Sequence, residues 1–193
     1  MAISNPLDVL TRHLFADPGA RVYAVLDGAA IPDLPQALRE HRVEAVCLYR
    51  GDLIPELAQA APYQAILERE SPFTAWLLQQ GWGRHWGIFA LGAAEWRPMR
   101  EHLCGLTMAY DPDFQPLYFR YYDPRVLRVY LPTCDADELR TLFGPISRLL
   151  CEDEDGGLLK FWVAGGQLGK DRVELEIPAR PQAGGPGRDA GKE

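Results

Sequence analysis

The order of hydrophobic and polar positions divides the first 105 residues into alternating strands and helices. Nearly continuous apolar runs at Arg21–Asp27 and 44–49 are typical of strands buried on both faces. Two further strands are expected at 63–67 and 85–91. Helical spacing and capping residues predict helices before and between these strands, near residues 5–14, 33–40, 53–60, 72–80 and 95–104. This alternation predicts an α/β fold with a mixed, largely parallel sheet flanked by helices.

After residue 105 the pattern changes to shorter elements. We expect two strands joined by an Asp-Pro-Asp turn, two short helices, a second hairpin and an edge strand, at 106–110, 117–122, 125–130, 136–143, 147–152, 158–163 and 172–177. We therefore assign residues 1–105 to an N-terminal α/β part. Residues 106–178 form a smaller C-terminal helix-plus-hairpin part of the same domain, and residues 179–193, rich in glycine, proline and charge, form a disordered tail.

The junction between the strand expected at 117–122 and the following helix is unusually charged. Arg120, Asp123 and Arg125 fall within six residues, where core positions are expected. Asp123 before Pro124 is a good N-cap, because its carboxylate can accept hydrogen bonds from the first free amides of the helix. The two arginines can bracket this carboxylate in a charge-assisted network, or they can bind a partner. The sequence leaves both roles open.

Four tryptophans, at positions 76, 82, 86 and 96, are concentrated in one stretch. Core packing accounts for them most simply. Alternatively, Trp82 and Trp86, which lie around two glycines, present anchors for another protein, since aromatic residues dominate binding hot spots.

Charge and composition exclude several classes of partner. The net charge of −7 argues against non-specific nucleic-acid binding and against docking on an anionic membrane, both of which require clustered lysine and arginine. The N-terminus has no basic segment followed by an apolar run, and the most apolar stretch, 86–94, is about half of a membrane span. We therefore expect a soluble, cytoplasmic protein that binds neither nucleic acid nor membrane.

The usual arrangements of catalytic residues are absent from the sequence. None of the three serines lies in a Gly-x-Ser-x-Gly elbow, the four cysteines are widely spaced, and the four histidines are isolated. The turn after Asp27 has one glycine where a dinucleotide fingerprint needs three. We expect no catalytic residue, no metal and no cofactor. Asp27 nevertheless stands at a strand end, where ligands bind in α/β sheets, so a ligand-binding crevice is a second interpretation.

The charged junction also carries a resemblance. Residues 119–127, Phe-Arg-Tyr-Tyr-Asp-Pro-Arg-Val-Leu, resemble the signature of the family catalogued as domain of unknown function 4123, which comprises type VI secretion adaptors, also called effector chaperones. Shorter matches follow the order of the family's elements, at 23–29, 48–51, 61–63, 101–103 and 141–145. The resemblance covers roughly residues 21–164.

The resemblance implies a non-enzymatic protein that binds a toxic effector in the cytoplasm of a Gram-negative bacterium and loads it onto its cognate VgrG spike. Because the family supplies no agreed contact residues, we assign partner binding as a hypothesis to Arg120, Tyr122, Asp123, Arg125, Trp82 and Trp86. The alternative is a small α/β enzyme or a nucleotide- or metabolite-binding module that acts at the strand ends, with Asp27 and the charged junction as its polar residues.

Overall fold

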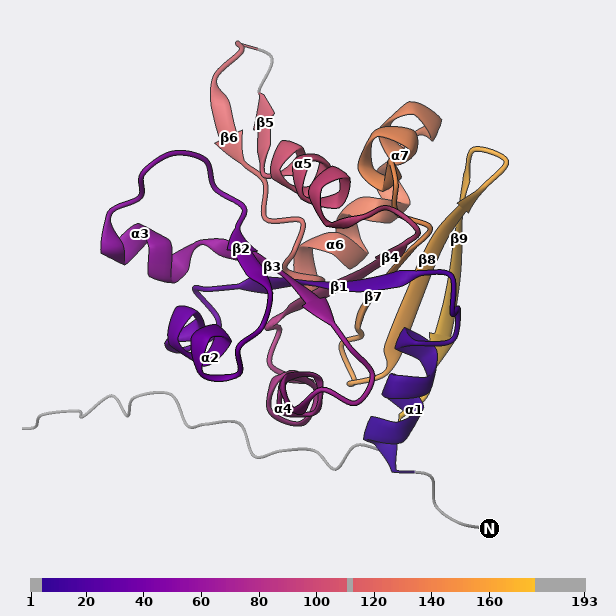
Figure 1. The fold of residues 1–193 in the computed structure, drawn as a ribbon. Coiled ribbons are helices and arrows are strands. Elements are labelled where there is room, and N and C mark those ends of the chain that lie inside the picture. Colours follow the sequence, from indigo (N-terminus) through magenta and orange to yellow (C-terminus); the bar gives the residue numbers. More distant parts are fainter. Residues whose placement is uncertain (1–4, 111–112, 176–193) are drawn as a thin grey trace, which may run out of the picture.

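A seven-stranded sheet forms the centre of the computed structural model, which describes residues 5–110 and 113–175 (Figure 1). Its strands lie in the order β2-β3-β1-β4-β7-β8-β9, and each neighbouring pair is antiparallel. The bounds are β1 Arg21–Asp27, β2 Ala45–Cys47, β3 Pro62–Leu67, β4 Gly87–Gly92, β7 Arg148–Glu152, β8 Leu158–Ala164 and β9 Gln167–Val173. A separate two-stranded hairpin consists of β5 (Met108–Tyr110) and β6 (Pro116–Tyr118).

The expectation of a largely parallel sheet is wrong, and the topology explains why. The connection from β1 to β2 through α2 does join two strands of the same direction, but β3 lies between them. In the same way β3 and β4 run in the same direction on either side of β1. The crossovers from β1 to β2 and from β3 to β4 therefore each pass one strand position, which a strand of opposite direction fills. Alternating strands and helices reveal the crossovers but not which strands become neighbours.

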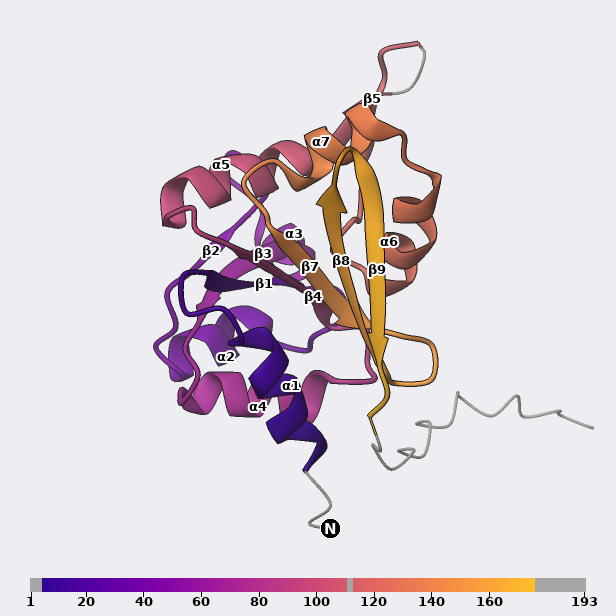
Figure 2. The ribbon, with the colours of Figure 1, turned by 90° about the vertical axis from the view of Figure 1, so that its right-hand side faces the viewer.

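Helices cover both faces of the sheet (Figure 2). One face carries α1 (Pro6–Leu14), α2 (Leu34–Glu40) and α4 (Pro72–Gly81), and the other carries α5 (Trp96–Leu106), α6 (Pro124–Tyr130) and α7 (Ala136–Phe143). The short α3 (Pro55–Ala60) buries none of its residues. A single 3-10 turn, η1 (Leu131–Thr133), follows α6.

The central strand β1 shows how the two layers of core arise. Its side chains alternate, so that Tyr23 and Val25 pack with α5, α6 and α7 while Val22, Ala24 and Leu26 pack with α1, α2 and α4. All of β1 after Arg21 is buried. An apolar run without polar alternation thus reports burial on both faces, which helices on both sides produce for either strand direction.

The helix starts follow the capping residues expected from the sequence. Asn5, Ser71, Asp123 and Asp135 each accept a hydrogen bond from the backbone N–H two residues later. Asp135 also forms a reciprocal capping box with Glu138. The last strand, expected at 172–177, lies earlier, at Gln167–Val173. The tail assigned to 179–193 lies outside the described residues.

Candidate functional site

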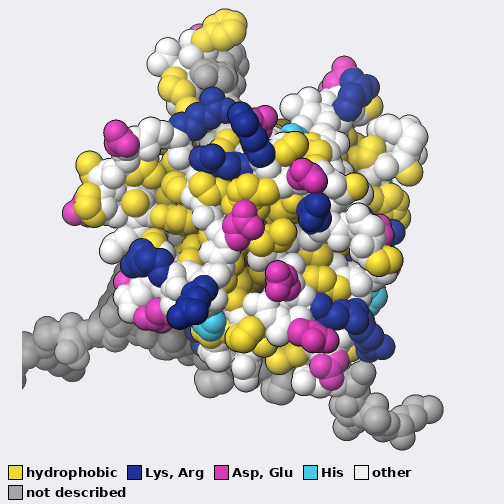
Figure 3. All heavy atoms as spheres, viewed as in Figure 1, with side chains coloured by type: hydrophobic (Ala, Val, Ile, Leu, Met, Phe, Trp, Pro, Cys, Tyr) yellow, Lys and Arg dark blue, Asp and Glu magenta, His cyan; other side chains and the backbone are white. Residues whose placement is uncertain are grey.

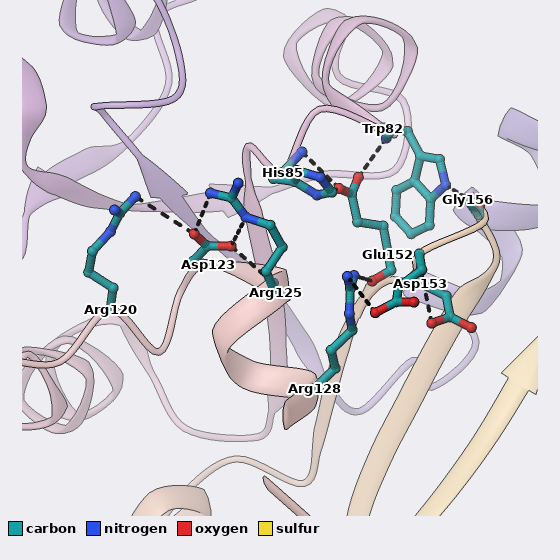
Figure 4. Close-up of polar contacts among 11 residues, drawn as sticks. Trp82, His85, Arg120, Asp123, Arg125, Arg128, Glu152, Asp153 and Gly156 are labelled. Atoms are coloured by element: carbon teal, nitrogen blue, oxygen red, sulfur yellow. Dashed lines mark hydrogen bonds and ion pairs between the residues drawn. The ribbon is translucent and has the colours of Figure 1, made fainter. Parts of the chain in front are cut away.

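Polar side chains gather at one end of the sheet because neighbouring strands are antiparallel. Asp27 ends β1, Glu152 ends β7, and β4 begins between them, two residues after His85. The segment before α6 crosses the same end of the sheet and contributes Arg120 and Asp123 (Figure 4). We refer to Asp27, Arg120, Asp123 and Arg125 as the junction network.

Asp27 and Arg120 form an ion pair that the sequence analysis did not anticipate. Asp27 is 1% exposed, and its Oδ2 accepts a hydrogen bond from Arg120 Nη2 at 2.5 Å. Its other oxygen accepts from the Ala29 amide at 3.0 Å, which closes the turn after β1. Since the Arg120 side chain is 46% exposed, the pair joins a buried carboxylate to a guanidinium that reaches solvent. The hydrogen bond from Arg120 thus compensates the buried charge of Asp27.

Asp123 has two roles at the start of α6. Its Oδ1 accepts from the Arg125 amide at 3.0 Å as an N-cap, and both oxygens accept from the Arg125 guanidinium at 3.0 and 2.7 Å. Arg120 Nη2 lies 3.8 Å from the same carboxylate. Burial raises the pKa of Asp123, but the side-chain and backbone hydrogen bonds from Arg125 and the charges of both arginines outweigh burial and lower it overall. Structural roles thus account for both oxygens.

Tyr122 connects this network to the segment after β2. Its ring is 2% exposed, and its hydroxyl lies 3.3 Å from the hydroxyl of Tyr49. Burial raises the pKa of Tyr122 well above its ordinary value, and the Tyr49 hydrogen bond and the nearby Asp27 carboxylate act in the same direction. Tyr122 is therefore a neutral hydrogen-bonding group inside the protein. As the structure places it, its ring is not on the surface.

A second polar cluster surrounds Glu152, which is 3% exposed. Its carboxylate accepts from the backbone amides of Gly83 and His85 at 2.5 and 2.8 Å and lies against His85 Nδ1. Gly83 and His85 both have positive φ angles, +80° and +58°, so the chain bends around the carboxylate and both amides point at it. Burial raises the pKa of Glu152, while His85 and the two amides act in the opposite direction.

The two tryptophans assigned to partner binding lie in the core beside this cluster. Trp82 and Trp86 are each 8% exposed. Both belong to the core layer on the face of the sheet that carries α1, α2 and α4. Trp82 Nε1 donates to the Gly156 carbonyl at 2.7 Å, which holds the β7–β8 turn (Figure 4). The placement of both rings fits core packing, the simpler of the two interpretations. Neither indole presents the exposed face that a hot-spot anchor needs.

The Glu152 cluster offers little room for a ligand. A cavity beside Glu152 and Trp82 has a volume of about 20 Å³, which is room for about one water molecule. Within residues 5–110 and 113–175, no three His, Cys, Asp or Glu side chains are placed to hold a metal ion. Burial raises the pKa of each of the four cysteine thiols, which disfavours the nucleophilic thiolate.

Exposed hydrophobic side chains, not charged ones, distinguish the surface next to the network. Sequence reasoning missed this feature: it predicts a strand at 117–122 without its exposure, and Leu117 and Tyr118 are 51% and 64% exposed. Phe114, in the turn of the same hairpin, is 83% exposed. Only Arg120 and Arg125 among the six assigned residues reach the surface substantially. The sequence feature that could have pointed to this surface is the density of aromatic residues before Arg120, but that density does not show which side chains are exposed.

Comparison with known proteins identifies one family. The family model described as Domain of unknown function (DUF4123) matches residues 22–141, which include β1, the junction network and most of α7. A search of curated proteins found no match, and a search of solved structures found none. The described part of the chain contains no helix long and apolar enough to cross a membrane. Since the match spans more than half of the chain, the protein belongs to the DUF4123 family, which is associated with type VI secretion adaptors.

Proposed function

We propose that the protein is a non-enzymatic adaptor that binds a type VI secretion effector in the cytoplasm of a Gram-negative bacterium and loads it onto its cognate VgrG spike. The observation that carries the proposal is the family match over residues 22–141. Such a role requires a stable scaffold with an accessible binding surface. It does not require catalytic residues.

The geometry supports this role in two ways. The carboxylates of the junction network are held by arginines and backbone amides of the same chain, so their hydrogen-bonding capacity serves the fold. The hairpin β5–β6, by contrast, carries Phe114, Leu117 and Tyr118 into solvent. Exposed apolar side chains that cluster mark protein-binding surfaces more often than catalytic ones.

Co-expression tests the proposal directly. The full-length protein, carrying an affinity tag, is produced with each candidate toxin and spike protein found among the neighbouring genes, and the purified material is analysed by size-exclusion chromatography with light scattering. We expect a stable complex with the toxin, and a ternary complex when the spike is added. If neither neighbour co-purifies with the adaptor, the proposed function is wrong.

A second candidate is a small enzyme or metabolite-binding module acting at the strand ends. It is favoured by one observation, the meeting of the Asp27 carboxylate with the Arg120 guanidinium at the end of β1. A thermal-shift screen with nucleotides and phosphorylated metabolites tests it. A stabilising compound whose effect is lost in the Asp27→Asn variant would support this candidate, and no shift across the panel would exclude these ligand classes.

A further inference from the structure

Large hydrophobic side chains are exposed mainly in two segments of the chain. Among the described residues, seven such side chains are exposed, and only Val129 on α6 lies outside these segments. The first segment is at the start of α3, and the second is the hairpin β5–β6 with its turn. The six side chains are Ile54, Leu57, Met108, Phe114, Leu117 and Tyr118.

A groove separates the hairpin from the chain that leads to α3, and of the six exposed side chains Met108 and Tyr118 line it. The rings of Tyr49 and Tyr118 are 5.1 Å apart, which brings the chain after β2 against the hairpin. A groove of about 450 Å³ runs between them, with Tyr49 and Leu53 on one wall and Met108 and Tyr118 on the other. Its floor includes the end of α5 around Cys104. A groove of this volume fits several side chains of a bound segment.

Positive charge borders the groove on one side. A neighbouring hollow of about 550 Å³ is lined by Arg50, Arg97 and Arg100, and Arg50 lines the groove as well. Arg97 pairs with Glu101 at 3.0 Å, whereas within residues 5–110 and 113–175 neither Arg50 nor Arg100 forms an ion pair with a carboxylate. Figure 3 shows Lys and Arg side chains gathered at the base of the hairpin, next to an area of hydrophobic side chains. This is a local cationic edge on a chain whose net charge is −7.

We infer that this groove binds an amphipathic, acidic segment of the adaptor's protein partner, with apolar side chains in the groove and carboxylates against Arg50 and Arg100. The inference rests on the proposed function and adds the location and chemistry of the contact. Apolar burial supplies the affinity, and the two arginines select a segment with negative charge on one side. A second copy of this acidic chain is a less suitable occupant, since two such chains repel each other at long range.

Two contacts link the sides of the groove to the junction network or to the residue beside it. Tyr49, which forms one wall, reaches the buried Tyr122 through the 3.3 Å contact of their hydroxyls. Tyr118, on the opposite wall, is two residues before Arg120, which the pair with Asp27 fixes to the sheet. One wall is thereby linked to Tyr122 and the other to the end of β1. The binding surface is preformed, which lowers the entropic cost of binding.

The test compares variants of the full chain in the complex with the co-expressed toxin and spike. Charge reversal in Arg50→Glu/Arg100→Glu and removal of apolar area in Met108→Ser/Tyr118→Ser should each weaken capture of one partner by at least tenfold in Kd. The matched controls, Arg140→Glu on α7 and Val129→Ser on α6, change an exposed arginine and an exposed valine outside the groove and should capture normally. Because all substituted side chains are exposed, the variants should melt close to the wild type, which circular dichroism checks.

Three results would overturn the inference. If the wild type captures a partner and both groove variants capture it equally well, the groove is not the contact, and the proposed function stands. If only the apolar variant loses binding and raising the salt concentration has no effect, the partner segment is not acidic. If the wild type is a dimer that the groove variants dissociate while capture is unchanged, the occupant is a second copy of the chain. Absence of capture by the wild type refutes the proposed function itself.

Discussion

Substitution of Arg120 by methionine should destabilise the protein by leaving the Asp27 carboxylate buried without its cation. Removing one partner typically costs about 3–5 kcal/mol when an ion pair is buried and about 0–1 kcal/mol when it is exposed. Asp27 is 1% exposed but the Arg120 side chain is 46% exposed, so water can replace part of the lost interaction. We therefore expect a loss of about 2–3 kcal/mol in the free energy of unfolding for Arg120→Met. The corresponding fall in melting temperature is about 4–12 °C for a chain of this size.

The double variant Asp27→Asn/Arg120→Met separates this mechanism from a loss of packing. The asparagine is neutral, and its carbonyl can still accept the Ala29 amide, so the uncompensated charge disappears while the turn is kept. The double variant should then be more stable than Arg120→Met alone by about 1–2 kcal/mol. Arg140→Met is the control, because Arg140 and its partner Asp137 are both exposed, and it should change stability by less than about 0.5 kcal/mol.

Urea unfolding monitored by tryptophan fluorescence and by circular dichroism measures these differences, and agreement of the two signals verifies two-state behaviour. The reasoning is refuted if the double variant is less stable than Arg120→Met. It is equally refuted if Arg120→Met unfolds at the same urea concentration as the Arg140→Met control. In either case Arg120 would contribute through something other than its charge next to Asp27.

Two further predictions concern acid stability and a close backbone approach. Because the pKa of Asp123 is lowered in the folded state, its ionised form stabilises the protein above about pH 4, and this contribution is lost as the pH falls through the folded pKa. Asp123→Asn retains an N-cap and should therefore be less stable than the wild type by about 1–2 kcal/mol at pH 7. The difference in unfolding free energy should be smaller at pH 3. Urea titrations that give the same difference at both pH values would contradict this. Gly28→Ala should destabilise by at least about 2 kcal/mol, because its Cβ would collide with the backbone carbonyls of Gln59 and Ala61. Gly105→Ala in α5, where a Cβ meets nothing within 4 Å, should be neutral or stabilise by up to about 1 kcal/mol. Urea unfolding measures both glycine variants.

Local elements of the fold could be predicted from the sequence, and the pairing of strands could not. Capping residues and apolar periodicity report on a few neighbouring residues, and they placed α4 and α7 within one or two residues of their observed ends. Strand direction depends on which strands become neighbours, and the insertion of β3 between β1 and β2 leaves no trace in either segment. An antiparallel sheet covered by helices on both faces therefore looks like a parallel one at the level of hydrophobic pattern.

At the candidate site, too, contacts between residues close in sequence could be predicted, and contacts between distant residues could not. Asp123 and Arg125 are two residues apart, and both their capping contact and their ion pair follow from that spacing. Asp27 and Arg120 are 93 positions apart, so their pairing depends on the tertiary fold. The tryptophans show a second limit of the sequence, since an aromatic residue beside glycine fits both a surface anchor and a core position. Only the contact of Trp82 with Phe89 and its hydrogen bond to Gly156 place it inside.

The segment that carries the family resemblance is mainly scaffold, and this separates recognition of the family from recognition of the partner. Within residues 119–127, Tyr121, Tyr122, Asp123 and Leu127 are each at most 3% exposed. The exposed hydrophobic residues Leu117 and Tyr118 come immediately before this segment and are attached to it covalently. The junction network therefore fixes where the hairpin begins, while side chains outside it are available to contact another protein. Substitutions in the network should lower stability first and binding only as a consequence, whereas substitutions on the hairpin should lower binding alone.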